Sequence, residues 1–560
     1  MPRVDPITLT IVTPLAGAAA AFLTGAFGTG RLAGKLLALS LVVSGGIVLY
    51  LYPGLRESKG FALVVGGWAP SVGIELYLDG LAWVLLLTLF LVSFAILLSA
   101  LGDGVYGGIF YAVYGIAVAG MAGVILSADL FNLFVFFEVL SLAATILIAY
   151  KRQLTGLYSA YRYLLITALS VTLYLLGLFI LYRATGELRF AAVLPENLPR
   201  NGAYPHVLTL AGVLLFVGVA IRAALVPFHT WLPDAHSQAP HPVSALLSGL
   251  VIKAAFIALW RMVGIFSADP RFMGLLTGVG LLSALFGVVL ALVQRDAKRL
   301  LAYHSISQMG YIAVAAGTGV MTGAVYHIVG HALFKSLLFL IVGYYITAVG
   351  SRDLYKMGGS GRCARGGVGV VPVALFLVGA GAIAGLPPFV GFVSKGLIGA
   401  GVKGPLSYWG LKAVSVGTAA SFIKLGWFML PAGRSGASLS SGEGRRRFKG
   451  SSATPFIGMG SLALFIIALG VLPGQFLGVM EGAGVTGGGE RLYSVGTLYS
   501  GRQFLEIAVT LLVGFALFAI LRTEPGRWLS TRVSEFRLGV DGALAVTALG
   551  LLAGVGTFVL

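Results

Sequence analysis

Long apolar runs separated by short polar segments follow one another along almost the whole chain. About sixteen of these runs approach the roughly 20 residues that an α-helix needs to cross the hydrocarbon core of a bilayer. Their centres lie near residues 16, 44, 90, 117, 140, 172, 215, 254, 283, 312, 336, 380, 418, 464, 512 and 550. Because the runs are long and do not alternate with a period of two, they exclude a β-barrel. The pattern predicts an all-α polytopic membrane protein with about 14–16 transmembrane helices.

Two segments do not fit the pattern of spanning helices. Residues 61–77 alternate between apolar and polar positions around a Pro/Gly turn, which predicts a β-hairpin on the outer face of the membrane. Residues 434–451, RSGASLSSGEGRRRFKGS, are of low complexity and basic, which predicts a disordered cytoplasmic loop. This loop separates a larger core from a C-terminal group of helices.

The composition agrees with a membrane protein, since 58% of the 560 residues are hydrophobic and only 10% are charged. The net charge of +18 does not indicate nucleic-acid binding, because the basic residues gather in alternate loops. Prominent among them are Lys151, Arg152, Arg295, Lys298, Arg299, Arg352, Lys356, Arg445, Arg446 and Arg447. The positive-inside rule then places these loops in the cytoplasm and both termini outside, in a prokaryotic plasma membrane.

Cofactor and metal sites are not expected in this chain. Cys363 is the only cysteine, which excludes an internal disulfide and a cysteine-ligated iron–sulfur cluster. No Walker P-loop, HExxH or GxSxG motif is present, which argues against a self-contained ATPase or hydrolase. A metal reading of His229, Asp234, His236 and His241 is open, but their spacings match no standard site and the neighbouring prolines favour a re-entrant connector.

Charged side chains occur inside the apolar runs, where each costs at least about 2.5 kcal/mol at the bilayer centre on insertion scales. They are Glu138, Arg222, Lys253, Lys335, Lys395, Lys412 and Lys424. Snorkelling explains Lys412 and Lys424 equally well, since they lie toward the two ends of their helix. One buried pair could be a static contact that holds helices in register. Several such sites in one chain favour function, and a desolvated lysine such as Lys253 can exchange its proton at cellular pH.

A stripe of polar residues predicts a proton relay. His327, His331 and Lys335 are spaced four apart, so they line one helix face about 6 Å apart along the axis. One bridging water between neighbours would complete a path. The preceding segment AYHSISQMGY could extend it with the side chains of His304, Ser305, Ser307 and Gln308. Two histidines and a lysine on one stripe favour a relay over hydrogen-bonded spacers.

Two proline motifs interrupt long apolar runs. ALVPF contains Pro227, and GLPPF contains Pro387 and Pro388. Proline inside a helix removes a hydrogen bond and clashes with the preceding turn, so both helices are expected to break. A pair of broken helices in corresponding halves indicates a transporter with inverted repeats. The alternative is that these prolines only kink their helices.

The motifs ADLFNLFVFFEV, VPFHTWLPDAHSQAPHPVSALLSGLVIK, LLAYHSISQMGY and HALFKSLLFL resemble the ion-translocating antiporter-like subunits. This family includes subunits of Mrp-type Na+/H+ antiporters, of respiratory complex I, and of membrane-bound hydrogenases and sulfur reductases. The resemblance runs from about residue 65 to 430, and it implies two inverted five-helix repeats with helices 7 and 12 broken around a polar axis. The implied divisions are residues 1–104 (N-terminal transmembrane helices with the hairpin), 105–268 (first repeat), 269–432 (second repeat), 433–452 (basic cytoplasmic loop) and 453–560 (C-terminal transmembrane helices).

The resemblance also implies roles for the buried charges. Glu138 takes the place of the fifth-helix glutamate, and Lys253 that of the eighth-helix lysine. The eleventh-helix relay falls on His327, His331 and Lys335, while Lys395 matches the terminal lysine that faces a half-channel. The transported ions would be H+ and, in an antiporter, Na+.

Arg222 departs from the family pattern, which has a lysine five residues before the proline of helix 7. Arginine does not release its proton in proteins. Either the first half-channel works through Glu138 and Lys253 around a fixed cation, or that half does not pump. Arg222 is expected to keep Glu138 ionised, in a pair worth roughly 3 kcal/mol at about 5 Å and an effective dielectric constant near 20.

The sequence thus predicts a proton-translocating membrane subunit, with Na+ exchange left open, of a multisubunit respiratory or Mrp-type complex. Its partners would be further antiporter-like subunits and a peripheral redox module. The alternative is a scaffold subunit whose ion pairs conduct nothing. A quinone-reducing enzyme lacks support because no cofactor ligands are visible. Residues 523–539 would form a helix of only about 26 Å, too short for the long lateral helix of one complex I subunit.

Overall fold

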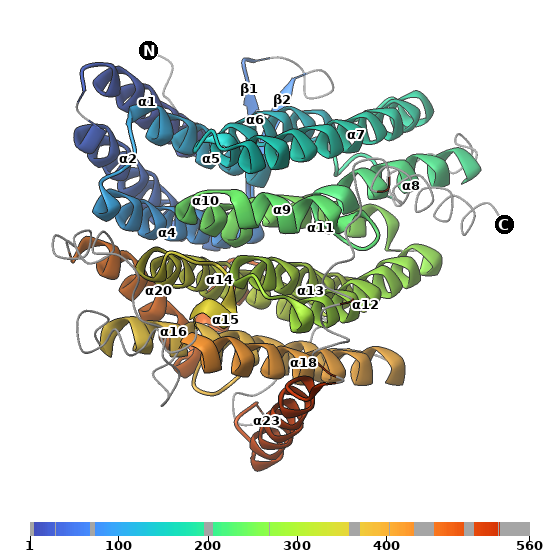
Figure 1. The fold of residues 1–560 in the computed structure, drawn as a ribbon. Helices are drawn as coiled ribbons and strands as arrows, with labels where there is room; N and C mark the ends of the chain where they lie inside the picture. The colour runs from blue at the N-terminus through green and yellow to red at the C-terminus, as the bar shows by residue number, and fades with distance from the viewer. Residues whose placement is uncertain are drawn as a thin grey trace.

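The computed structural model describes residues 5–28, 30–67, 73–194, 205–267, 269–357, 370–402, 404–429, 453–485 and 498–524, with single positions 526, 532 and 542. Long helices lie side by side in stacked rows (Figure 1). Within the described part of the chain, 11 helices are long and apolar enough to cross a membrane. Every predicted centre up to residue 512 lies inside a helix, and the centre near residue 550 is outside the described residues. The chain is an all-α polytopic membrane protein.

The N-terminal part contains helices and the one hairpin found among the described residues. Its helices are α1 (Pro6–Ala26), α2 (Gly30–Tyr50), α3 (Tyr52–Ser58), α4 (Gly80–Asp103) and α5 (Gly108–Leu126). Strands β1 (Phe61–Val65) and β2 (Ile74–Leu78) pair antiparallel, with Phe61 opposite Leu78, as the alternating pattern predicted. Asp79 then begins α4, because its carboxylate accepts from the backbone N–H of Ala82 at 2.8 Å.

The central part is built from one continuous series of packed helices. Its first elements are α6 (Leu130–Ala149), α7 (Leu154–Thr185), α8 (Pro205–Arg222), the 3₁₀ turn η1 (Phe228–Thr230), α9 (Trp231–Gln238), α10 (His241–Leu246), the π-turn η2 (Leu247–Val251) and α11 (Ile252–Phe266). They are followed by α12 (Pro270–Val293), α13 (Ala297–Gly317), α14 (Met321–Val349), α15 (Leu354–Met357), α16 (Val370–Ala384), α17 (Val390–Gly401) and α18 (Pro405–Met429). The repeat boundaries at 105–268 and 269–432 stay predictions.

Three further helices complete the described chain: α20 (Thr454–Val471), α21 (Pro473–Gly482) and α23 (Gly501–Leu521). The helix α20 packs on α4, α14 and α16, whereas α23 packs on α18 at the edge of the molecule (Figure 1). The predicted loop at 433–452 and Cys363 lie outside the described residues, as does nearly all of segment 523–539. The placement of both termini outside the membrane stays a prediction.

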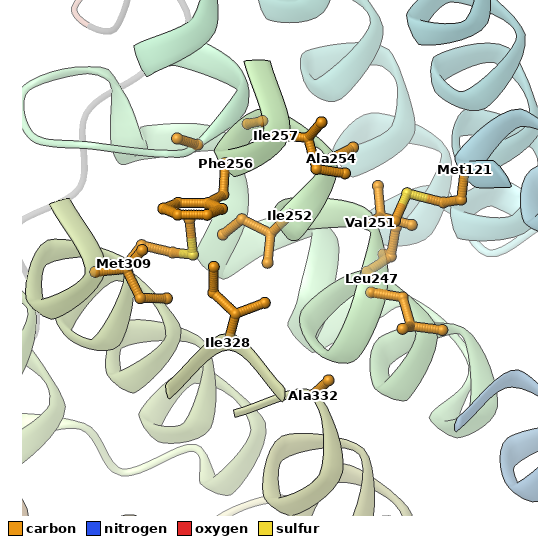
Figure 2. Packing of buried hydrophobic residues seen from close by; sticks show 14 of the residues in the cluster. Met121, Leu247, Val251, Ile252, Ala254, Phe256, Ile257, Met309, Ile328 and Ala332 are labelled. Carbon is orange, nitrogen blue, oxygen red and sulfur yellow. The ribbon is translucent and has the colours of Figure 1, made fainter. Parts of the chain in front are cut away.

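The core centres on α11, α13 and α14. Figure 2 shows Ile252 and Phe256 of α11 meeting Met309 of α13 and Ile328 of α14. These apolar side chains are almost completely buried. The buried polar side chains of α11, α13 and α14 are therefore set in a tightly packed apolar frame, which holds them in fixed positions and separates them from lipid.

Candidate functional site

The first helix interruption lies between Arg222, the last residue of α8, and η1. Pro227 is in a cis peptide bond with Val226. The backbone groups freed at the break find partners inside the protein: the N–H of Val226 donates to Ser283 Oγ at 2.8 Å, and Trp231 Nε1 donates to the Ile221 carbonyl at 2.9 Å. Irregular backbone at membrane depth is tolerated where the protein satisfies it in this way.

The second interruption separates α16, which ends at Ala384, from α17, which begins at Val390. Pro387 and Pro388 lie between them, joined by a cis peptide bond. The Nζ of Lys395 donates to the carbonyl of Ile383 at 2.7 Å. The end of α16 thus presents the negative end of a helix dipole to this partly buried lysine.

Close packing at this second break requires a glycine. A Cβ on Gly391 would overlap the carbonyl oxygen of Ala382. We expect Gly391→Ala to push α17 away from α16 and to lower the stability of the protein by about 1–3 kcal/mol, as overpacking commonly does. Thermal unfolding of the purified complex measures this. Gly399→Ala is the control, because nothing lies within 4 Å of its Cβ position in the same helix; equal effects of the two variants would contradict the prediction.

Glu138 and Arg222 form an ion pair between α6 and α8. Arg222 Nη2 lies 2.7 Å from Glu138 Oε1, and the guanidinium also donates to Ser170 Oγ at 3.1 Å and to Ser141 Oγ at 2.6 Å. The nitrogen that donates to Ser141, Nη1, also donates to the carbonyl of Phe137 at 3.3 Å. Arg222 is nearly buried, whereas the side chain of Glu138 is 36% exposed. The arginine is therefore held on several sides, and the carboxylate is the accessible member of the pair.

Lys253 is buried one turn from a local irregularity that the sequence did not reveal. The π-turn Leu247–Val251 ends two residues before Lys253. The Nζ of Lys253 donates to the carbonyl of Ser248 inside that turn. Ser248 Oγ in turn shares a hydrogen bond of 2.8 Å with Ser305 Oγ of α13. A π-turn frees a carbonyl from the regular ladder, and such turns are frequent at functional sites. Here it links Lys253 to α13.

The relay residues on α14 are all buried, and hydrogen bonds join one of them to both neighbouring helices. His327 Nε2 lies 3.1 Å from Gln308 Oε1 of α13, and His327 Nδ1 lies 2.9 Å from Ser394 Oγ of α17. The rings of His327 and His331 are 6.2 Å apart between centroids. His327 therefore connects α13 to α17 at the residue next to Lys395.

The other predicted relay residues have different surroundings. Lys335 Nζ donates to the carbonyl of Leu301. Ser307 donates to the Ala284 carbonyl at 2.8 Å, so it joins α13 to α12, and its part in the relay stays a prediction. His304 packs against Phe422, with the ring centroids 5.0 Å apart. Of the four residues proposed as an extension, Ser305 and Gln308 are the two whose side chains bond to the predicted path.

Lys395 faces a cavity of about 480 Å³. Its Nζ lies 5.4 Å from the ring centroid of Tyr311, whose hydroxyl donates to the Leu411 carbonyl at 2.5 Å and lies 2.7 Å from Ser415 Oγ. Tyr311 and Ser415 also line the cavity. Lys395 therefore has direct access to a space large enough for several waters.

Three charged groups have roles that sequence reasoning missed. Asp234 accepts from Arg162 of α7 and from Arg299 of α13, the latter at 2.9 Å, so it is engaged in ion pairs. Lys412 forms an ion pair with Glu506 of α23. Lys424 is buried and donates to the carbonyls of Leu292 and Gln294 at 2.8 and 2.6 Å, so it caps α12 and does not snorkel to the surface. These contacts join distant segments and leave no local sequence signal.

Comparisons with known proteins find similar sequences and similar folds. The family model described as NADH:quinone oxidoreductase/Mrp antiporter, TM matches residues 127–421. NADH-quinone oxidoreductase subunit N of Desulforudis audaxviator is 35% identical over 405 residues, covering 69% of this chain and 78% of that protein. A Na(+)/H(+) antiporter subunit of Alkalihalophilus pseudofirmus is 33% identical over 366 residues, covering 62% of this chain and 71% of that protein.

Two solved structures share the fold. A chain of the Mrp complex from Dietzia sp. DQ12-45-1b is similar with a TM-score of 0.76 at 23% identity, covering 90% of this chain and 99% of that chain. A chain of the membrane-bound sulfane sulfur reductase, an archaeal respiratory membrane complex, has a TM-score of 0.74 at 25% identity with the same two coverages.

Proposed function

The chain belongs to the family of antiporter-like membrane subunits found in complex I and Mrp-type complexes, and on this premise we propose that it translocates protons along its buried polar axis. It does so as one subunit of a larger membrane complex. The similar chains named above come from an Mrp complex and a respiratory membrane complex, which supports an assembly with further antiporter-like subunits. A peripheral redox module is the partner we propose as the energy source, since Cys363 is the chain's sole cysteine.

One observation carries the proposal: polar contacts run from α13 through α14 to a lysine that opens on a cavity. Gln308 bonds to His327, His327 bonds to Ser394, and Ser394 precedes Lys395 in α17. A static ion pair would need none of these neutral groups. Neutral imidazole and hydroxyl groups both donate and accept, which is what stepwise proton transfer requires.

Electrostatic coupling follows from the arrangement of the axis lysines. Within the described part of the chain, Lys253, Lys335 and Lys395 make no contact with a carboxylate, and each donates instead to a backbone carbonyl. A carbonyl accommodates either the charged or the neutral amine. Protonation of one lysine therefore opposes protonation of its neighbours through low-dielectric surroundings, which passes the charge forward. Water between His331 and its neighbours completes this path in our proposal.

A scaffold role is the second candidate, and Arg222 is the observation that favours it. Its guanidinium is fixed by four acceptors and cannot give up a proton. In the scaffold role the Glu138–Arg222 pair would only hold α6 against α8.

Replacement of the axis lysines separates the two candidates. The assay is pH-gradient formation by membrane vesicles that contain the complete complex, in sodium-free medium and with added Na+. Under proton translocation, Lys253→Ala or Lys395→Ala removes the gradient, whereas under the scaffold role both variants retain it. Dependence of the gradient on Na+ would identify exchange with that ion.

A further inference from the structure

The cavity in front of Lys395 has an outer wall that the family-wide match does not reach. Helix α17 supplies Lys395, α18 supplies Lys412 and Ser415, and α23 supplies Arg502 and Glu506. The matched region ends at residue 421, whereas α23 spans Gly501–Leu521. The part of the wall formed by α23 therefore lies outside the family match.

Glu506 lies between an inner and an outer cation. Its carboxylate forms an ion pair with Lys412 on the cavity side, and its other oxygen lies 3.3 Å from Nε of Arg502. The side chain of Arg502 is 83% exposed, while that of Glu506 is 24% exposed. The carboxylate thus stands where the cavity meets the outside of the protein, and within the described part of the chain it is the one acidic residue that lines the cavity.

The location of this acid is unusual for its helix. Among the residues of α23 only Gly514 and Phe518 are buried, so most of the helix faces away from the protein. Glu506 is the one acidic residue of this exposed, apolar helix, and its charge is accommodated by cations that line the cavity.

Polar groups connect the two ends of the cavity. At the inner end, Tyr311 contacts Lys395 and shares a hydrogen bond of 2.7 Å with Ser415. Ser415 and Lys412 are three residues apart on α18, so they lie on the same helix face. Lys412 then reaches Glu506.

We propose that Glu506 is the terminal proton-exchange group of this chain and that its ion pair with Lys412 is the gate at the outer end of the cavity. The inference rests on the proposed proton translocation and extends it to the exit. The ligand of the site is a proton carried by water in the cavity.

The step balances as follows. With the Lys412 contact open, an N–H bond of protonated Lys395 breaks, its proton crosses the cavity water, and an O–H bond forms on the Glu506 carboxylate. Lys395 becomes neutral and Glu506 becomes a neutral acid, so no net charge is created. Release of that proton past Arg502 restores the carboxylate, which closes again on Lys412.

The charged and titratable groups facing Glu506 come from each helix around the cavity. They are Lys412 and Tyr408 of α18, Arg502 of its own helix, Lys395 of α17 and Tyr311 of α13. The nearest are the cations Lys412 and Arg502, and both also line the cavity.

The test compares Glu506→Gln, Glu506→Asp and Lys412→Gln in the complete complex in sealed vesicles. Glu506→Gln is expected to slow pH-gradient formation by about a hundredfold, the lower end of what one positioned proton-transfer group contributes. Glu506→Asp is expected to restore most of the rate with a shifted pH profile, because it keeps the carboxylate. Lys412→Gln is expected to open the gate, so that an imposed pH gradient decays faster without an energy source.

The matched control is Glu481→Gln, an exposed acid of α21 outside the cavity lining, which is expected to leave the rate unchanged. Transport at the normal rate in Glu506→Gln would overturn the inference. If the Glu506→Gln complex does not assemble, Lys412→Gln is the deciding variant. An imposed pH gradient that decays no faster in Lys412→Gln than in the unmodified complex would overturn the gate. Lys395→Ala separates the two proposals: loss of transport there with normal transport in Glu506→Gln leaves proton translocation standing and removes only this exit.

Discussion

Alanine at position 395 is expected to abolish pH-gradient formation by the complete complex, lowering the initial rate by about a hundredfold or more. Lys395 is the axis residue that faces the cavity, and it takes up its position through the carbonyl of Ile383 at the end of α16. Its removal leaves His327 and Ser394 without the amine that accepts the proton at the cavity end of this path. The measurement is the rate of acidification, normalised to the amount of assembled complex.

Arginine at the same position makes this prediction sharper. Lys395→Arg keeps the positive charge and much of the volume but does not release a proton. If the role of Lys395 is structural, arginine restores pH-gradient formation. If Lys395 exchanges protons, arginine does not restore it. Lys424→Ala is the companion control, because Lys424 is a buried lysine that caps α12. It is expected to lower stability while the rate per assembled complex stays near normal. Full activity of Lys395→Ala would favour the scaffold role.

Alanine at position 253 is expected to have the second largest effect, again a loss of about a hundredfold in the rate of pH-gradient formation. Lys253 of α11 is the axis lysine nearest in sequence to the Glu138–Arg222 pair, in which the cation is an arginine of α8 that does not release its proton. Its contact with the Ser248 carbonyl joins it through Ser305 to α13. If the first half conducts, it must do so through Lys253.

Lys253→Ala also tests whether the half of the axis that contains Arg222 takes part in transport. Loss of transport in both lysine variants shows that the two halves work in series. Normal transport in Lys253→Ala together with loss in Lys395→Ala would show that the arginine-containing half does not pump. Ser305→Ala is a useful intermediate change, because it removes the hydroxyl that Ser248 contacts and leaves the lysine in place.

The elements that could be predicted from the sequence are those with local causes. Both helix interruptions lie at prolines, whose missing N–H and ring geometry act within one turn. The hairpin follows from alternation around a turn in a chain otherwise made of unbroken apolar runs. The fold class follows from run length alone, since a run of about 20 apolar residues is what a transmembrane helix requires.

Contacts across long sequence separations could not be predicted in the same way. Glu506 and Lys412 lie 94 residues apart, and Asp234 lies 72 residues from Arg162. Nothing in either local pattern indicates the partner. The π-turn before Lys253 also has no periodic signature, because its extra residue is accommodated by packing of η2 against α14. The hydrogen bond of the Ser307 hydroxyl to helix α12 likewise has no local signal, and a relay role for Ser307 stays a prediction.

Asp234 ties distant parts of the molecule together mechanically. It lies on α9, just after the first break, and arginines from α7 and α13 bind its two carboxylate oxygens. Any displacement of α9 that preserves both ion pairs must carry α7 and α13 with it. A shift that starts at the broken helix would therefore be transmitted as a concerted movement of three helices rather than absorbed locally.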